Sequence, residues 1–290
     1  AGKGHDALKG GAGDDDPIGG TGADTFFGGA GNDWFSGGDI TDTIGGSDFN
    51  LISYADIAAP VSIYIANGFG SATGAASGQD YFKNINMVRG STGNDTITGS
   101  SSEMVLEQIE GDLGNDFLDG GLITDTLNQA NGNRVSYQNA AGSVTVDLQA
   151  NTATGAAGTD TLSNFNQVRG SASGDTLLGS DSALTERFEG MAGNDSIDGR
   201  GGYDFVAYDR ADNAVTVNLS SGTATNDGYG DIDTFSNIEG IRGSAYNDVL
   251  TGGLAANGVS VSDGLIEMFM GNGGNDTIDG GTGIDTAVFS

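Results

Sequence analysis

The chain lacks most of the residues on which common catalytic and metal sites depend. It has no cysteine, one histidine and ten lysines and arginines among 290 residues. Without cysteine, disulfides and thiolate metal sites are excluded. His5 alone cannot supply a catalytic triad or a histidine zinc site, and the motifs G-x-S-x-G and H-E-x-x-H do not occur. We therefore predict that this chain is not an enzyme.

Long apolar segments are also missing. No apolar run approaches the roughly 20 residues that span a bilayer, and no secretory signal peptide is visible. The chain opens and stops at a repeat, so we expect it to be part of a longer protein.

What the chain has in excess is negative charge. Forty acidic residues against ten basic ones give a net charge of -30 and a pI of about 4.1. Nucleic acid is therefore excluded as a partner, and docking on anionic lipid is disfavoured. Such a chain is either disordered and solvated or folded and neutralised by cations. The 53 glycines favour disorder by composition, but glycine and aspartate recur periodically, which predicts a repeat architecture.

The repeat is nine residues long. The first 45 residues read AGKGHDALK, GGAGDDDPI, GGTGADTFF, GGAGNDWFS and GGDITDTIG, and the template is G-G-x-G-x-D-x-U-x with U a large apolar residue. Nine further copies occupy 90–98, 111–119, 120–128, 170–178, 190–198, 199–207, 243–251, 271–279 and 280–288. The sixth-position aspartates are Asp6, Asp15, Asp24, Asp33, Asp42, Asp95, Asp116, Asp125, Asp175, Asp195, Asp204, Asp248, Asp276 and Asp285. Glycine permits turns with positive φ, and carboxylate and carbonyl oxygens are the ligands that calcium prefers.

This template resembles the RTX (repeats-in-toxin, haemolysin-type) calcium-binding nonapeptide repeat family. The resemblance implies an all-β fold, a right-handed parallel β-roll or β-helix solenoid. In it, six residues of each repeat form a turn and three form a strand. It also implies that several calcium ions lie between turns stacked on one edge, held by the fourteen aspartates and by main-chain carbonyls. Because stacked carboxylates repel each other, calcium binding should be coupled to folding. The alternative is that the aspartates only form Asx-turns. This is plausible for any single aspartate but not for the whole set.

A longer period begins after residue 45. Tyr54, Tyr137, Tyr208 and Phe289 are equivalent and are separated by 83, 71 and 81 residues. An alternating apolar strand follows each tyrosine, and we expect the residues there to form loops or to widen the coil. We predict one continuous solenoid over 1–290, made of the tandem array 1–45 and of longer units at 46–128, 129–207 and 208–290.

Segments that link the copies carry Glu107, Glu186 and Glu267 at the aspartate-to-U spacing, so we interpret them as degenerate half-turns. The pairs then expected on one edge are Asp6 with Asp24, Asp15 with Asp33, Asp24 with Asp42, Asp95 with Asp116, Asp175 with Asp195, and Asp248 with Asp276. Asp125, Asp204 and Asp285 would face the glutamates and are predicted to be the weakest of the ligands. Asp80, Asp160 and Asp233 are additional, weaker candidates.

Three arginines recur at one place in the longer units: Arg89, Arg169 and Arg242. They are either a ligand row for acidic glycans or internal salt bridges, and we favour the salt bridges. We likewise expect Trp34 and the repeated tyrosines to be packing or surface residues rather than a sugar platform.

The resemblance implies a protein secreted by a Gram-negative bacterium through a type I system, unfolded at cytosolic calcium and folded outside the cell. We predict a structural or adhesive module of a surface-layer, adhesin or matrix protein, associated with the cell surface. Self-association or cell-surface polysaccharide would then be its partner. The alternative is the C-terminal accessory region of a secreted enzyme or toxin, such as a protease, a lipase or a polysaccharide-modifying enzyme.

Overall fold

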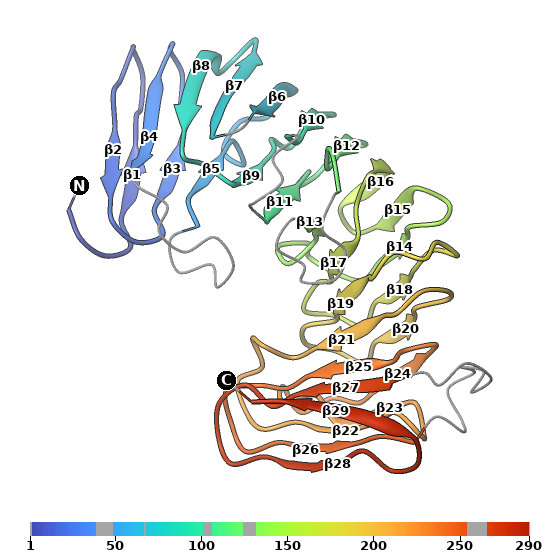
Figure 1. Cartoon of the computed structure of the whole chain (residues 1–290). Coiled ribbons are helices and arrows are strands. Elements are labelled where there is room, and N and C mark those ends of the chain that lie inside the picture. Colours follow the sequence, from blue (N-terminus) through green and yellow to red (C-terminus); the bar gives the residue numbers. More distant parts are fainter. Residues whose placement is uncertain are drawn as a thin grey trace. The chain divides into compact units, whose positions relative to one another are not determined.

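A computed structural model describes residues 2–38, 49–66, 68–100, 106–123, 132–253 and 266–289 (Figure 1). The regular elements in these ranges are all strands, which confirms the predicted all-β class. The described part of the chain contains no helix long and apolar enough to cross a membrane. Two compact units are formed, Ala1–Tyr137 with Asn151–Asn166, and Gln138–Ala150 with Gln167–Ser290. The single continuous solenoid stays a prediction.

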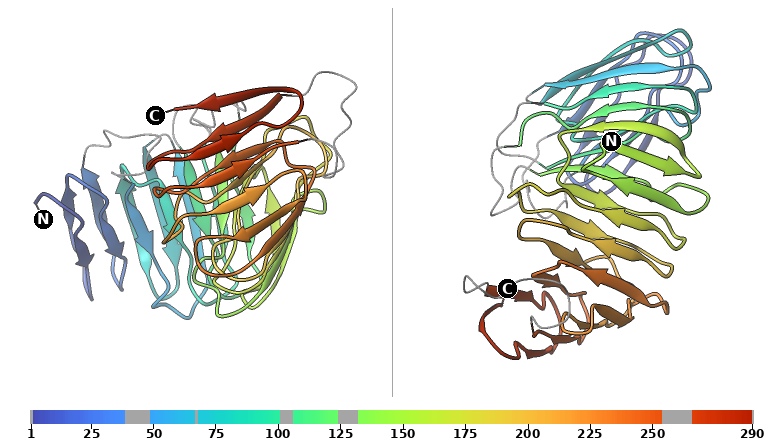
Figure 2. Two further views of the ribbon diagram at one scale, coloured as in Figure 1. Left: turned by 90° about the horizontal axis from the view of Figure 1, so that it is seen from below. Right: turned by 90° about the vertical axis from the view of Figure 1, so that its right-hand side faces the viewer.

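The first unit is built on two sheets that the chain visits in alternation (Figure 2). One is wholly parallel, with strands β1 (Ala7–Lys9), β3 (Thr25–Phe27), β5 (Leu51–Ser53), β9 (Met87–Arg89), β11 (Glu107–Glu110) and β13 (Asn133–Ser136) in that order. The other runs β2 (Ile18–Gly20), β4 (Trp34–Gly38), β8 (Gly78–Lys83), β7 (Phe69–Gly74), β6 (Val61–Ala66), β10 (Thr96–Thr98), β12 (Phe117–Asp119), β16 (Gly158–Ser163) and β15 (Thr152–Gly155). Alternation between two parallel sheets is the arrangement of a β-roll.

The second unit repeats this arrangement. Its wholly parallel sheet holds β17 (Gln167–Arg169), β19 (Arg187–Glu189), β21 (Phe205–Ala207), β25 (Gly240–Arg242), β27 (Ile266–Met270) and β29 (Ile284–Val288). Its other sheet holds β14 (Val144–Asp147), β18 (Thr176–Leu178), β20 (Ser196–Asp198), β24 (Asp233–Ser236), β23 (Thr223–Asn226), β22 (Thr216–Asn218), β26 (Val249–Thr251) and β28 (Thr277–Asp279).

The core is made by the U position of the repeat. A nonapeptide strand is three residues long, so only its middle side chain points between the sheets. Ile97, Leu118, Leu177 and Leu250 hold this position in β10, β12, β18 and β26, and each is completely buried. The register places Ile97 beside Leu118 in neighbouring coils. One apolar residue per strand therefore forms a continuous internal row, as the template predicted.

The widened coils take a specific form. In the first unit the residues after Tyr54 make a three-stranded antiparallel meander, in which β6 pairs with β7 and β7 with β8. Its outer strands join the parallel ladder, β8 to β4 and β6 to β10. In the second unit β22, β23 and β24 form a corresponding meander. These insertions lengthen the sheet, and they bring the chain back to the sixth position of the repeat.

Candidate calcium sites

Carboxylates of the sixth position form ladders that run from coil to coil. The main-chain N–H of Asp95 donates to Oδ1 of Asp116 over 2.8 Å, and the N–H of Asp175 donates to Oδ1 of Asp195 over 2.8 Å. The same bond links Asp6 to Asp24, Asp15 to Asp33, and Asp248 to Asp276. Five of the six expected pairs are thus neighbours.

The sixth pair, Asp24 with Asp42, stays a prediction. One coil beyond Asp24 the structure places Asn50, whose Oδ1 accepts the Asp24 N–H at 2.9 Å. Strand β3 pairs with β5, so Asn50, directly before β5, holds the sixth position. Asp42 and Asp125 lie outside the described residues. The nonapeptide spacing did not identify Asn50 as a sixth-position residue, because Asn50 lies outside the nonapeptide copies.

Among the described residues, three ladders along the second sheet end on the weaker candidates. The N–H groups of Asp33, Asp116 and Asp195 donate to Oδ1 of Asp80, Asp160 and Asp233, respectively. The other oxygen of each end residue accepts the hydroxyl of a repeated tyrosine, Tyr54, Tyr137 or Tyr208, at 2.8–3.0 Å. The three tyrosines are buried. The expectation of packing residues is right for their rings, but the hydrogen bond to an aspartate was not foreseen.

On the opposite edge glutamate replaces aspartate, as expected. The N–H of Glu186 donates to Oδ1 of Asp204, and the N–H of Asp204 donates to Glu239. Glu267 lies directly beside Asp285 in the register of β27 and β29. Glu239 belongs to the same row and was missed, although it stands two residues before Ile241, the spacing of the other glutamates.

Two kinds of turn hold these aspartates. In the first kind, serine is the second residue of the repeat. The N–H of Ser91 donates to Oδ2 of Asp95 over 2.6 Å, and its hydroxyl donates to Oδ1 over 2.7 Å. Ser171 and Ser244 bind Asp175 and Asp248 in the same way. Both oxygens of these three carboxylates are therefore satisfied by the protein.

In the second kind, one carboxylate oxygen is buried and has no hydrogen-bond partner. The oxygens are Oδ2 of Asp15, Asp24, Asp33, Asp116, Asp195 and Asp204, and Oδ1 of Asp285. The second residue of each such turn has positive φ: Gly11, Gly20, Gly29, Asp112, Met191, Arg200 and Gly281. Left-handed φ is costly for methionine and arginine, and strain of this kind gathers at functional sites.

The unpartnered oxygen lies inside its own turn. A side chain at Gly111 would overlap Oδ2 of Asp116, and a side chain at Gly190 would overlap Oδ2 of Asp195. The glycine at the first position therefore makes room for the carboxylate. Asp6 and Asp276 are partly exposed, and Asp6 accepts the Gly2 N–H at 3.2 Å.

Burial favours the protonated form of three of the unpartnered carboxylates, Asp116, Asp195 and Asp204. It raises the pKa of Asp116 and of Asp195 to about 8, and that of Asp204 to about 9, with neighbouring carboxylates adding to the rise. The pKa of Asp95 is also raised by burial, but the donors Val61 and Ser91 oppose the rise. Asp116, Asp195 and Asp204 thus lack the positive charge and the additional donors that would stabilise their ionised form.

A calcium ion fits this donor set. It takes six to eight oxygen ligands, and a buried unpartnered carboxylate oxygen is destabilising until something binds it. Among the described residues, no three acidic or histidine side chains converge closely enough to hold a metal by themselves. Main-chain carbonyls of the glycine-rich turns would therefore have to complete the shell. The residues that would hold calcium are those with the unpartnered oxygen.

The recurrent arginines form internal ion pairs. Nη2 of Arg89 lies 2.9 Å from Asp112, Nε of Arg169 lies 2.7 Å from Glu189, and Nε of Arg242 lies 3.1 Å from Asp209. Arg169 is almost completely buried, which leaves no surface for a glycan there. The salt-bridge interpretation is confirmed.

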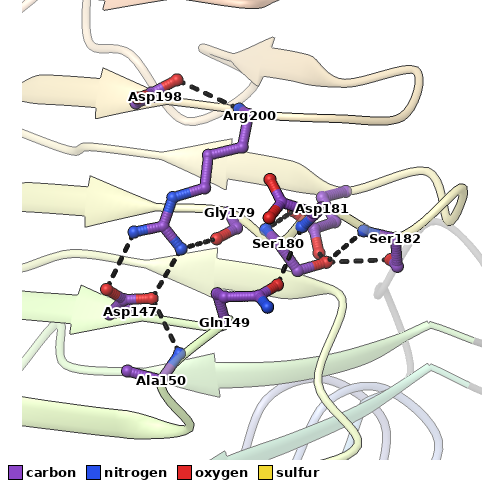
Figure 3. A network of polar contacts seen from close by, with 10 residues as sticks. Asp147, Gln149, Ala150, Gly179, Ser180, Asp181, Ser182, Asp198 and Arg200 are labelled. Carbon is purple, nitrogen blue, oxygen red and sulfur yellow. Dashed lines mark hydrogen bonds and ion pairs between the residues drawn. The ribbon is translucent and has the colours of Figure 1, made fainter.

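Arg200 makes a further internal pair that the sequence did not single out (Figure 3). Its two terminal nitrogens contact both oxygens of Asp147, at 2.8 and 2.9 Å, and one of them also donates to the carbonyl of Gly179. The Arg200 N–H donates to Asp198. Three coils of the second unit are joined by this side chain, which helps to hold the left-handed residue in place.

Comparison with known families agrees with this geometry. The model of a family described as the RTX calcium-binding nonapeptide repeat matches residues 1–16, 18–50, 84–102, 107–128, 182–213, 241–264 and 269–287. Together these stretches cover more than half of the chain. A search of curated proteins found no match.

Proposed function

Because the chain belongs to the RTX calcium-binding nonapeptide repeat family, we propose that it is a structural or adhesive module that calcium folds outside the cell. The repeats of this family bind several calcium ions, form a structural rather than a catalytic module, and typify secreted bacterial proteins. The parent would be a surface-layer, adhesin or matrix protein of a Gram-negative bacterium, and the module itself would have no enzymatic activity.

The observation that carries the proposal is the set of buried, unpartnered oxygens in turns with a left-handed second residue. We assign calcium to Asp15, Asp24, Asp33, Asp116, Asp195, Asp204 and Asp285. This changes the order expected from the sequence. Asp204, placed among the weakest ligands, becomes one of the strongest, whereas the serine-bound Asp95, Asp175 and Asp248 become the weakest.

A scaffolding role is supported by what the insertions do. The meanders extend the sheets and do not form a separate lobe. A chain made of sheet rungs and ion-holding turns suits a part that transmits force or spaces other parts. No specific observation supports the alternative, an accessory region of a secreted enzyme or toxin.

Calcium titration tests the proposal. Chelator-treated protein would be followed by far-ultraviolet circular dichroism and by light scattering as calcium is added. We expect β structure to appear with calcium, and particle size to grow further if the module is adhesive. Full β signal in chelator, indifferent to calcium, would refute calcium-coupled folding. If calcium increased the β signal in circular dichroism without any self-association, calcium-coupled folding would be supported and the adhesive role would be contradicted.

A further inference from the structure

In the second unit, the loop that joins β23 to β24 is longer than the loop that joins β15 to β16 in the first unit. Ala224 pairs with Asp233, which leaves residues 225–232 between them, whereas Ala153 pairs with Asp160 and leaves only 154–159. The additional residues belong to the segment N-D-G-Y-G-D at 226–231. This segment lies outside every nonapeptide copy.

Asp227 is the buried residue of that loop, and its side chain is completely inaccessible. In the corresponding loops, between β7 and β8 and between β15 and β16, the buried residues are the uncharged Ser77 and Ala157. A carboxylate in such a place needs compensation, because burying an unpaired charge is costly. The longer loop therefore brings an ionisable group to a site where the other meanders have none.

The two oxygens of Asp227 differ sharply. Oδ1 accepts three main-chain N–H groups, from Tyr229, Gly230 and Asp231, each at 2.9 Å. Oδ2 is buried and has no hydrogen-bond partner. Three donors on one oxygen fix the carboxylate rigidly, so the other oxygen is held in place for a ligand that the protein does not provide.

The loop is attached to a turn that already has an unpartnered oxygen. Asp231 accepts the N–H of Gly193 at 3.1 Å, and Asn194 accepts the N–H of Ile232 at 3.0 Å. Both Gly193 and Asn194 belong to the turn of Asp195, whose Oδ2 has no partner. The charge of Asp227 reaches this turn, since it helps to raise the pKa of Asp195.

Among the residues that the structure describes, no basic side chain forms an ion pair with Asp227. Arg210 is tied to the loop, because its carbonyl accepts the hydroxyl of Tyr229 at 2.7 Å. Its guanidinium, however, lies 3.7 Å from Glu189. Asp233 is also close, but its oxygens are taken by the Asp195 N–H and by Tyr208. What remains is a rigid carboxylate oxygen in an acidic, oxygen-rich setting.

We propose that Asp227 forms an additional calcium site on the loop 227–231, beside the turn of Asp195 and outside the nonapeptide motif. A hard divalent cation suits carboxylate and carbonyl oxygens, and it would neutralise the loop and the turn together. The site depends on the proposed function only in that both need calcium. It would give the second unit a flank that calcium orders and that the meander of β15 and β16 lacks.

Asp227→Asn tests the site, since the amide oxygen can still accept the three loop N–H groups while the unpartnered oxygen is lost. Asp212→Asn is the matched control, because it removes one charge from an exposed residue of the same repeat. Calcium ions per chain would be counted by native mass spectrometry and by equilibrium dialysis of the whole chain. We expect one ion fewer in Asp227→Asn and no change in Asp212→Asn.

An unchanged ion count and affinity in Asp227→Asn would overturn the site while leaving the nonapeptide sites standing. If wild-type protein bound no calcium at all, the proposed function would fall as well, so the two failures differ. Should Asp227→Asn not fold, residues 225–232 would be replaced by residues 154–159, the shorter loop of the same chain. That variant should again bind one ion fewer, and the wild-type count would overturn the proposal.

Discussion

Two neighbouring turns of one ladder, 90–98 and 111–119, carry the same aspartate in different surroundings. Asp95 follows Ser91, and both of its oxygens accept hydrogen bonds from that serine. Asp116 follows Asp112, whose φ is 72°, and its Oδ2 has no partner. The turns of Asp175 and Asp195 in the second unit repeat this contrast with Ser171 and Met191. The second residue of the repeat, rather than the aspartate, therefore decides whether a turn needs an ion.

This contrast has a structural logic. Serine-led turns are complete without calcium, and so are the ladder ends that tyrosine closes. Two ladders thus place an ion-requiring turn between self-satisfied ones. Asp116 lies between Asp95 and Asp160, and Asp195 lies between Asp175 and Asp233. A few preformed turns can hold the register of the sheet while calcium completes the rest.

The largest expected effect concerns pH in calcium-free protein. Asp116, Asp195 and Asp204 have pKa values of about 8, about 8 and about 9 in the fold, against about 3.9 in an unfolded chain. A raised carboxyl pKa means that the fold binds the proton more tightly. Its contribution is complete below about pH 4 and is lost as pH rises toward the folded value.

We therefore expect the free energy of unfolding of metal-free protein to fall by several kcal/mol between pH 4 and 9. Urea denaturation would measure the free energy of unfolding at the acidic end of this range. Far-ultraviolet circular dichroism would follow the loss of β structure at higher pH, where the metal-free protein is expected to unfold. Saturating calcium should remove the decline, because the ion binds the deprotonated form. Metal-free stability that rises across this range would contradict the assignment of these three groups.

A smaller effect should follow from opening a tyrosine-closed end. Tyr137→Phe leaves Oδ2 of Asp160 buried without its donor, which should cost about 1–3 kcal/mol of unfolding free energy. The loss should be the same in saturating calcium and in metal-free protein at about pH 4, where the raised carboxyl pKa values favour the fold, because the bond involves no ion. Tyr246→Phe, at an exposed tyrosine, is the control and should change stability little. A loss for Tyr137→Phe seen only in calcium would show that the ladder end takes part in ion binding.

The smallest effect in free energy is the most specific. Exchanging the second residues of one ladder, as Ser171→Gly and Met191→Ser in separate variants, should move single ions. Ser171→Gly frees an oxygen of Asp175 and should add one calcium per chain. Met191→Ser should supply the missing donor to Asp195 and remove one. Isothermal titration would count the calcium ions. Equal stoichiometry in both variants would contradict the inference that the second residue of the repeat decides whether a turn needs an ion.

Much of this arrangement could be predicted from the sequence. The template predicted the two-sheet roll, the buried U row and five of six aspartate pairs, because repeat spacing and strand period are local properties. Asp80, Asp160 and Asp233 were recognised two residues before an apolar strand position, although only as weak candidates. Glutamate in the opposite row was expected from the same spacing.

The rest depended on contacts between distant residues. Asn50 holds a sixth position outside every nonapeptide copy, so the spacing does not record it. The bond from Tyr137 to Asp160 spans a meander. The difference between Ser91 and Asp112 is a backbone conformation, and the template treats both as departures from glycine. Asp227 belongs to no nonapeptide copy, so the nine-residue period could not find it.

Calcium stoichiometry of two single variants tests the central claim most directly. Asp116→Asn removes the oxygen that has no partner, and Asp95→Asn changes a neighbour on the same ladder whose oxygens are already satisfied. Isothermal titration of each variant against wild type should show one ion fewer for Asp116→Asn and the wild-type number for Asp95→Asn. If both variants lost an ion, or only Asp95→Asn did, the unpartnered oxygens would not mark the calcium sites.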